Sequence, residues 1–237
     1  MPNEIIETIR GDYDRLAREY ARHVSGELDH KPIDRQFLDR FAEQVRGKGK
    51  VCDLGCGPGH VARYLHQQGV AVFGLDLSPG MVNEARVLNP DIQFSEANML
   101  ALDLHDEALG GLVAFYAIVN LPGASLPLAF AEMARVLKPN GHLLLSFHVG
   151  DETIPVSELW GVEISMEFRL LNPKLIADYL TEAGLIVEEL IERPPYAPEV
   201  EYQSRRAYVF ARKTPSKHIR GIALTEPEDS GSVFRSL

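Results

Sequence analysis

The fold of this chain is decided by the stretch VCDLGCGPGH at residues 51–60. The apolar run Val51–Leu54 is typical of a buried strand, three glycines follow at alternate positions, and a helical apolar pattern begins at Val61. Glycine tolerates positive φ and lets a ligand approach the backbone without a Cβ in the way. The start of a helix also leaves N–H groups free for an anionic group. The stretch therefore predicts a strand, a tight turn that can meet a ligand, and a helix.

The glycine spacing and the nearby acids narrow the choice of ligand. A dinucleotide fingerprint reads G-x-G-x-x-G, whereas the third glycine here, Gly59, comes one residue early. Asp53 stands two residues before the first glycine, where a carboxylate would repel a pyrophosphate but could receive an ammonium group. Asp76 ends the next apolar run, and its carboxylate can accept two hydrogen bonds at once, as a ribose diol requires. Alone, Asp76 would be an acid favoured by a helix macrodipole; together with the glycine loop, it favours ribose binding.

The pattern D-x-G-x-G-x-G followed by Asp76 resembles the first motif and the next acidic loop of the class I S-adenosylmethionine-dependent methyltransferases. The resemblance implies S-adenosyl-L-methionine as the cofactor and S-adenosyl-L-homocysteine as its product. It implies a set of cofactor-binding residues, namely Asp53, Gly55, Cys56, Gly57, Gly59, Asp76, Leu77, Met81, Asn98, Met99, Phe115 and Tyr20. In this family an acid commonly meets the adenine amine where this chain has Asn98, whose carbonyl accepts without charge. The alternative for Asn98 is a turn residue.

Strands and helices alternate along the rest of the chain. After the first strand, strands are expected at 70–75, 91–94, 112–118, 142–147, 185–191 and 207–211, with helices opening at Ser78 and spanning 126–137 and 173–183. Such alternation indicates a mainly parallel sheet with helices on both faces. With the resemblance, we expect an α/β fold with a doubly wound, seven-stranded, Rossmann-like methyltransferase sheet whose last strand is antiparallel.

Three parts of the chain are predicted. Apolar residues recur at helical spacing over 4–24 and 33–45, so residues 1–46 are expected to form an N-terminal helical cap. Residues 47–212 form the S-adenosylmethionine-binding domain, and residues 213–237 form a polar C-terminal tail. The N-terminal helices could merely pack on the sheet edge. In the family a leading helix caps the cofactor, which would bring Tyr13 and Tyr20 to the site.

Composition limits the partners and the compartment. The formal charge of −10 argues against a nucleic-acid or anionic-membrane partner, because phosphate binding relies on Lys and Arg. No apolar stretch approaches the roughly 20 residues that span a bilayer, and the N-terminus lacks the features of a secretory signal. Both cysteines lie inside the glycine motif, where a disulfide would distort the turn. A cytoplasmic location is therefore expected.

A hairpin arm is expected at residues 151–172. Val162, Ile164, Met166 and Phe168 alternate with Glu163, Ser165 and Glu167. In the family such inserts influence the choice of substrate. Trp160 on this arm therefore joins Tyr13, Tyr116 and Asn120 as a candidate substrate contact, and a half-buried hairpin without that role is the alternative.

His148 and Tyr116 are the candidate catalytic residues. Histidine titrates near neutrality and can serve as a general base, although a lone histidine after an apolar strand is more often a satisfied polar residue. By resemblance, Tyr116 and Asn120 face the acceptor and the backbone near Phe115 meets the methionine part of the cofactor. Core packing is the alternative for both aromatic residues. A metal site is excluded, because Cys52, Cys56 and His60 match no zinc spacing.

The sequence thus predicts an S-adenosylmethionine-dependent methyltransferase that acts on a small-molecule acceptor by in-line displacement. Such a reaction needs alignment and exclusion of water more than it needs a nucleophilic side chain. One alternative is a protein that binds S-adenosylmethionine without turnover, which Asn98 and the pair Gly110-Gly111 slightly favour, since family members often carry an acid where the two glycines stand. A nicotinamide oxidoreductase is disfavoured by Asp53, and a nucleic-acid methyltransferase by the charge. The acceptor atom (O, N or C) and the oligomeric state (monomer or homodimer) stay open.

Overall fold

The computed structural model describes residues 2–215, with side chains from residue 4 onward. The predicted C-terminal tail lies outside the described residues from 216 on. The helices are α1 Pro2–Val24, η1 Glu27–His30, α2 Pro32–Val45, α3 His60–Gln67, α4 Pro79–Leu88, η2 Gly123–Ser125, α5 Leu126–Val136 and α6 Pro173–Glu182. The strands are β1 Val51–Leu54, β2 Val72–Asp76, β3 Phe94–Glu96, β4 Leu109–Phe115, β5 Leu137–His148, β6 Thr153–Leu159, β7 Val162–Arg169, β8 Leu185–Arg193 and β9 Arg206–Lys213.

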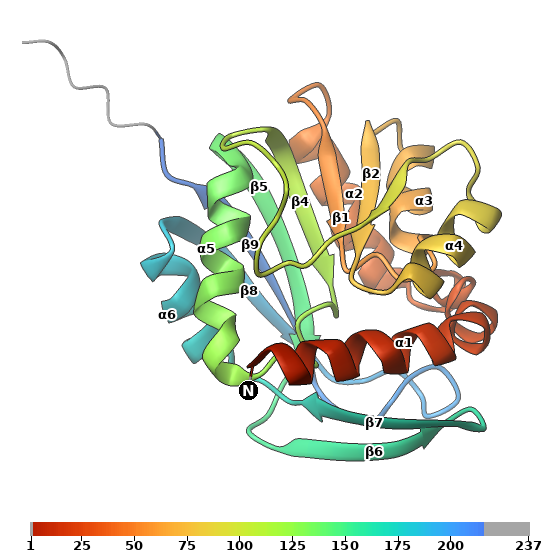
Figure 1. The fold of residues 1–237 in the computed structure, drawn as a ribbon. Coiled ribbons are helices and arrows are strands. Elements are labelled where there is room, and N and C mark those ends of the chain that lie inside the picture. Colours follow the sequence, from red (N-terminus) through yellow and green to blue (C-terminus); the bar gives the residue numbers. More distant parts are fainter. Residues whose placement is uncertain (1, 216–237) are drawn as a thin grey trace, which may run out of the picture.

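A seven-stranded sheet forms the centre of the molecule, in the order β3-β2-β1-β4-β5-β9-β8 (Figure 1). The pairs β3–β2, β2–β1, β1–β4 and β4–β5 are parallel, whereas β9 runs antiparallel to both β5 and β8. The predicted sheet, with its antiparallel last strand, is confirmed. The strand order reverses between β1 and β4, which is the switch point where open α/β sheets bind ligands.

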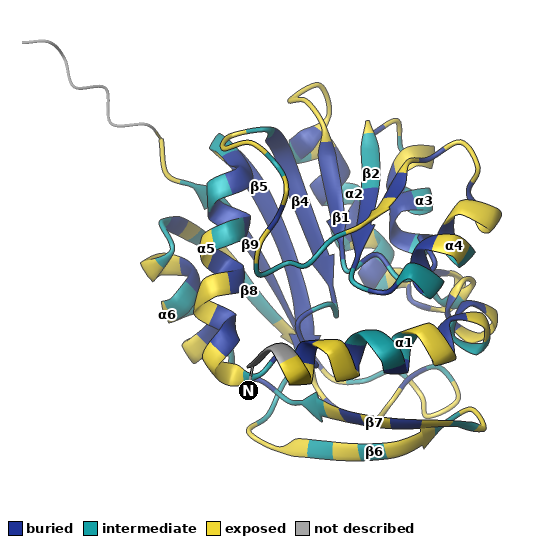
Figure 2. Ribbon diagram, viewed as in Figure 1, coloured by how far each residue is buried: buried dark blue, intermediate teal, exposed yellow. Residues whose placement is uncertain are grey.

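Helices cover both faces of this sheet. α5 and α6 pack on one face through a core that includes Phe130 and Ile176, and α2 and α3 pack on the other through Phe41 and Leu65. α4 packs beside α3, over β3. The central strands are buried along most of their length (Figure 2). This rigid layer fixes the carboxyl ends of β1, β2 and β4, where the site lies.

α1 and the β6–β7 hairpin lie across the carboxyl ends of the central strands (Figure 1). The alternation predicted for the arm is confirmed, because Ile164 and Met166 are buried against Leu16 of α1. Glu163, Ser165 and Glu167 are exposed. The N-terminal helix is therefore held between the sheet and the hairpin.

Strand boundaries differ from the prediction where side chains and turns redirect the backbone. The third strand begins at Phe94 and not at Asp91, because Ile92 N donates back to Asn89 O at 3.0 Å. The fourth strand ends at Phe115 and not at Ile118, because Tyr116 has a left-handed φ of 56°. The fifth begins at Leu137, which pairs with Leu109 ahead of an irregularity in the register.

In the part of the chain that the structure describes, no helix combines the length and the apolar character needed to cross a membrane.

Candidate active site

A cavity lies at the switch point of the sheet, between the glycine loop, the ends of β2 and β4, and α1. It is lined by Ile6, Ile9, Tyr13, Tyr20, Leu54, Gly55, Cys56, Gly57, His60, Asp76, Leu77, Met81, Ala97, Asn98, Met99, Phe115, Tyr116, Ala117, Asn120 and Leu121. Most residues predicted to bind the cofactor therefore meet in one place. The structure brings in Ile6 and Ile9 as well, and the apolar spacing of α1 was the signal that pointed to them.

The glycine loop allows close approach of backbone segments. Gly55 has φ 69°, and a Cβ there would lie 2.5 Å from the Cβ of Ala117. Gly57 has φ 51°, and a Cβ there would have no neighbour closer than Tyr20, at 3.7 Å. Several N–H groups of the loop are already paired, since Gly55 N and Cys56 N both donate to Leu75 O. The loop thus offers close backbone approach more than a set of free N–H donors.

Asp53 lies under the loop and does not line the cavity. Its Oδ2 accepts from Ala62 N at 2.9 Å, so it caps the first turn of α3. The side chain is buried, and burial raises the pKa of Asp53 to about 7, although His60 nearby acts in the opposite direction. The expected direct contact of Asp53 with an ammonium group is replaced by a supporting role.

Gly59 does not line the cavity either. It has φ 81° and is the N-cap of α3, and a Cβ there would lie 2.7 Å from the ring of Phe94. Its expected contact with the cofactor is thus replaced by close packing.

Asp76 lies in the cavity wall at the end of β2. Its Oδ2 accepts from Gly57 N at 2.8 Å, and its Oδ1 accepts from Ser78 N at 2.9 Å. These bonds fix the carboxylate, and each oxygen keeps a further lone pair. Burial raises the pKa of Asp76, whereas the backbone donors lower it. The position and the spare acceptor capacity match the hydroxyl-binding role predicted for Asp76.

One wall of the cavity is mostly apolar, formed by Leu77, Met81, Ala97 and Met99. Asn98 lies in this wall, and its Oδ1 accepts from Leu100 N at 2.9 Å. The turn role considered for Asn98 is therefore present. Its carbonyl retains one lone pair for a ligand.

His60 also lines the cavity, and sequence reasoning did not place it there. Its Nε2 lies 3.0 Å from Oε1 of Glu27, whereas its Nδ1 is buried without a hydrogen-bond partner in the described part of the chain. Burial opposes ionisation of Glu27, yet hydrogen bonds with His60 and Lys31 lower the pKa of that carboxyl to about 2. In the sequence, the position of His60 directly after Gly59 was the one sign that it could lie beside the cavity.

α1 closes the cavity and is tied to three neighbouring elements. Asp14 Oδ1 accepts from Ser78 Oγ at 2.5 Å and from Gly80 N at 2.9 Å, which joins α1 to the start of α4. Asp12 Oδ2 accepts from Ser165 N of β7 at 2.9 Å. Tyr13 donates to Asn120 Oδ1 at 2.7 Å, in the loop after β4. The capping position predicted for α1 follows from these contacts.

Trp160 does not reach the cavity wall. It lies at the turn of the hairpin, 40% exposed, with its ring stacked on His23 at a centroid distance of 4.3 Å. An edge contact with Tyr20 adds to this, at 5.7 Å. Trp160 was predicted as a substrate contact, but it instead packs the turn of the hairpin against the end of α1.

Tyr116 forms the wall of the cavity at the end of β4, in the left-handed conformation that aromatic residues rarely adopt. Its N–H donates to Ser146, and its hydroxyl lies 3.0 Å from that of Tyr208. Burial raises the pKa of Tyr116, with the carboxylate of Asp34 acting in the same direction. The hydroxyl therefore stays protonated and is a poor candidate for a general base.

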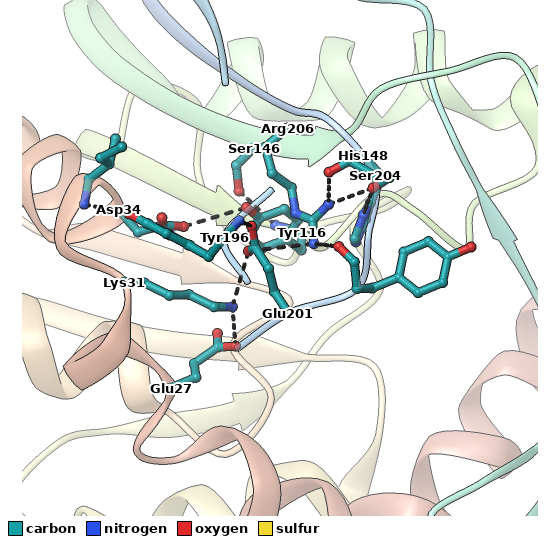
Figure 3. Close-up of polar contacts among 12 residues, drawn as sticks. Glu27, Lys31, Asp34, Tyr116, Ser146, His148, Tyr196, Glu201, Ser204 and Arg206 are labelled. Atoms are coloured by element: carbon teal, nitrogen blue, oxygen red, sulfur yellow. Dashed lines mark hydrogen bonds and ion pairs between the residues drawn. The ribbon is translucent and has the colours of Figure 1, made fainter. Parts of the chain in front are cut away.

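A buried polar network lies behind Tyr116 (Figure 3). Tyr208 donates to Asp34 Oδ1 at 2.8 Å, and Arg193 bridges Asp34 and Glu201 at 2.8 and 2.5 Å. The network also contains Lys31, Arg206, Tyr196, Ser204 and Glu27. Arg193 and Arg206 are both buried within this network. Each of these buried cations is paired with a carboxylate, which offsets the cost of removing its charge from water.

His148 belongs to this network and does not line the cavity. Its Nδ1 lies 2.8 Å from Ser204 Oγ, which also accepts from Arg206. Burial lowers the pKa of His148 to about 3, and the charge of Arg206 adds to the effect. Such a neutral imidazole is too weakly basic to act as a general base near neutrality. The alternative of a satisfied polar residue at the sheet edge therefore describes His148.

Gly110 and Gly111 lie at the start of β4, the end of the strand opposite to the cavity. A Cβ at Gly110 would lie 2.4 Å from Lys48 O, and one at Gly111 would lie 2.5 Å from the side chain of Val45. The two glycines therefore allow the end of α2 to pack against β4. Because the two glycines have this packing role, they do not support the alternative of a protein that binds S-adenosylmethionine without turnover. Within residues 2–215, no group of three or more His, Cys, Asp and Glu side chains is arranged to hold a metal ion.

Comparison with known proteins adds an independent line of evidence. Residues 51–141 match the family described as a methyltransferase domain. Trans-aconitate 2-methyltransferase of Escherichia coli O139:H28 is 51% identical over 148 residues, which cover 58% of this chain and 57% of that protein. Malonyl-[acyl-carrier protein] O-methyltransferase of Enterobacter lignolyticus is 26% identical over 151 residues, which cover 63% of this chain and 59% of the relative. The matches thus span less than two thirds of these relatives.

A solved structure agrees in fold over most of the chain. The 1,6-didemethyltoxoflavin-N1-methyltransferase of Burkholderia thailandensis, solved with bound 1,6-didemethyltoxoflavin and S-adenosylhomocysteine, superposes with a TM-score of 0.67 at 17% identity. The match covers 90% of this chain and 91% of that one. At 17% identity, this likeness shows a shared fold and nothing further.

Proposed function

We propose that this chain is a class I S-adenosylmethionine-dependent methyltransferase and that it methylates an oxygen of a small carboxylic acid. The proposal rests on the cavity at the switch point and on the side chains that line it. It also rests on the acceptors that the names of the two relatives give, malonyl-[acyl-carrier protein] and trans-aconitate. A malonyl group and trans-aconitate both carry free carboxylate groups.

The residues around the cavity fit S-adenosylmethionine. Asp76 offers two fixed carboxylate oxygens for a diol, the wall containing Leu77 and Met99 suits a flat base, and Gly57 leaves the backbone uncovered. No Lys or Arg lines the cavity among the described residues, which agrees with a nucleoside that carries no phosphate. When bound, S-adenosylmethionine supplies a methyl group on a positively charged sulfonium.

The observation that carries the choice of acceptor is that Tyr13, Tyr116 and Asn120, which line the cavity, offer no general base. Burial raises the pKa of both tyrosines, and the amide does not titrate. His60 lines the same cavity, and its Nε2 is paired with Glu27. His148, behind Tyr116, stays neutral and weakly basic. An acceptor that is already ionised needs no base, and a carboxylate is ionised near neutrality.

The chain's contribution is to align the acceptor and exclude water. A carboxylate oxygen held in line forms the new bond to the methyl carbon while the electron pair of the broken carbon–sulfur bond stays on sulfur, giving a methyl ester and S-adenosylhomocysteine. No proton is transferred in this step. α1 and its ties to α4 and β7 shield the cavity from solvent, which favours the displacement over hydrolysis.

The test is a labelled-methyl assay on matched acceptors. The purified protein is incubated with S-[methyl-²H₃]adenosylmethionine and with carboxylic acids, including malonate and trans-aconitate, beside alcohols and amines of the same carbon skeleton. Mass spectrometry should find labelled methyl esters of one or more acids and no labelled ethers or methylamines. Methylation of the amines or alcohols in preference to the acids would contradict the proposed acceptor class.

A further inference from the structure

One ring nitrogen of His60 has no protein partner at the wall of the cofactor cavity. His60 is the first residue of α3 and lines that cavity, and its side chain is 12% exposed. Its Nε2 lies 3.0 Å from Glu27 Oε1, whereas Nδ1 is buried and forms no hydrogen bond with the described residues. A buried polar atom without a partner is costly. A molecule bound in the cavity would supply the partner that the described residues do not.

The contact with Glu27 sets which nitrogen of His60 carries the proton. Burial opposes ionisation of Glu27, but hydrogen bonds with His60 and Lys31 outweigh it and keep the carboxyl ionised. An ionised carboxylate only accepts hydrogen bonds, so Nε2 is the nitrogen that donates. Lys31 Nζ lies 2.6 Å from the other oxygen of Glu27 and already supplies a positive charge there (Figure 3). A neutral imidazole therefore satisfies Glu27, and the lone pair of this imidazole is on Nδ1.

His60 lies where the amino-acid end of S-adenosylmethionine is expected. In the proposed function the ribose binds Asp76 at the end of β2, and the base lies beside Leu77, toward β3. β1 is the neighbour of β2 on its other side, so the rest of the cofactor extends over the loop after β1. His60 follows this loop directly, and Tyr20 faces it from α1, since a Cβ at Gly57 would lie 3.7 Å from the Tyr20 ring.

The lining of the cavity suits an ammonium group at this end. Among the described residues that line it, Asp76 is the one acid and His60 the one imidazole, and there is no Lys or Arg. The free lone pairs of Asp76 are assigned to the ribose hydroxyls, and Asp53 faces Ala62 N instead of the cavity. An ammonium group is a donor only, so it requires an acceptor such as the lone pair of His60 Nδ1.

We propose that His60 Nδ1 accepts a hydrogen bond from the α-ammonium group of S-adenosylmethionine, and that Glu27 holds the imidazole in the tautomer that this bond requires. The proposal rests on the proposed function for the identity of the cofactor, but not for the identity of the acceptor. Glu27 acts through His60 and is a positioning residue. The bond fixes the amino-acid end of the cofactor, which limits the positions that the sulfonium can take in the cavity.

The test measures binding of three thioethers to the full-length protein by calorimetry. They are S-adenosylhomocysteine, the analogue in which hydrogen replaces its amino group, and the analogue in which hydrogen replaces its carboxylate. Loss of the amino group should weaken binding to the unaltered chain by about tenfold to a hundredfold, as expected for a hydrogen bond to a charged group. Loss of the carboxylate should leave the contribution of His60 intact.

His60→Gln is the variant, because its amide still offers a donor to Glu27 but leaves no acceptor at the position of Nδ1. It should bind the two thioethers that keep the amino group about tenfold more weakly. Binding of the analogue without the amino group should be unchanged, which also reports that the variant is folded. Equal losses for all three thioethers, or a loss confined to the two that keep the carboxylate, would overturn the proposal.

His66→Gln is the matched control. His66 also lies on α3 and also pairs with an acid, Asp91, at 3.3 Å, but it does not line the cavity. This control should bind all three thioethers as the unaltered chain does. If His66→Gln weakens the two amines as much as His60→Gln does, the effect does not come from contact in the cavity and the proposal fails.

The same titrations separate this proposal from the proposed function. If none of the three thioethers binds to the unaltered chain, the cofactor assignment fails, and the role of His60 fails with it. If all three bind and the amino group makes no difference to affinity, the cofactor assignment stands and the role of His60 alone fails.

Discussion

At the scale of single residues, the two acids beside the glycine loop have different roles. Both were predicted to contact the ligand, yet only Asp76 lines the cavity. Asp53 points to the N–H of Ala62 and supports the loop from below. The sequence could not separate these roles, because side-chain direction at the two strand ends depends on the loop that follows.

Asp76→Ala should weaken binding of the cofactor by about tenfold to a hundredfold. A hydrogen bond to a charged group contributes on the order of 1.5–3 kcal/mol, and the variant also removes the acceptors for Gly57 N and Ser78 N. Calorimetric titration with S-adenosylhomocysteine measures the change. Unchanged affinity would defeat the assignment of Asp76 to the ribose.

Asp53 should make stability fall as the pH rises. Its pKa is about 7 in the folded chain and near 3.8 when exposed, so between these values the folded state binds the extra proton. The substitution Asp53→Asn should remove this dependence and raise the free energy of unfolding relative to the unaltered chain, on the order of 3 kcal/mol at about pH 8. Urea unfolding at about pH 5 and about pH 8 measures it.

The control for Asp53→Asn is Asp178→Asn on α6, where the acid is exposed and pairs with Lys174. This control should leave the pH dependence as it is. If Asp53→Asn also leaves it unchanged, the burial argument for Asp53 is wrong.

His148→Gln should leave the shape of the pH–rate profile unchanged. Because the pKa of His148 is lowered to about 3, the imidazole is neutral at every pH above about 5 and contributes no inflection. The profile of kcat at saturating cofactor is measured for both proteins. Loss of an inflection near neutrality in the variant would restore His148 as a general base.

At the scale of elements, α1 is the part whose position the sequence predicted in outline only. Its apolar spacing indicated an amphipathic helix, and the resemblance implied a cap. The ties made by Asp12 to β7 and by Asp14 to α4 join residues far apart in the chain, and no local pattern announces them. The same holds for Arg193 and Asp34, which meet in the buried network from opposite ends of the sequence.

Asp14→Ala should loosen the cap. The variant loses the bonds from Ser78 Oγ and Gly80 N, so the dissociation rate of S-adenosylhomocysteine should rise on the order of tenfold. Hydrogen exchange of α1 should become faster as well. Glu19→Ala is the control, because Glu19 pairs within α1 with Arg22. Equal effects of the two variants would show that the tie to α4 does not hold the cap.

At the scale of the whole molecule, the sheet was the most predictable part. Alternating strands and helices indicated a mainly parallel sheet, and all seven of its strands were expected. The errors lie at strand ends such as Tyr116, where a left-handed residue held by tertiary contacts ends β4. The acceptor side was the least predictable, because α1, the hairpin and the loop after β4 build it together.

The crystal structure of the complex with S-adenosylhomocysteine tests the central claim most directly. The account predicts the nucleoside in the cavity at the switch point, with its ribose hydroxyls on the Asp76 carboxylate and its sulfur facing Tyr116. A ligand bound elsewhere, or a ribose that makes no contact with Asp76, would contradict it.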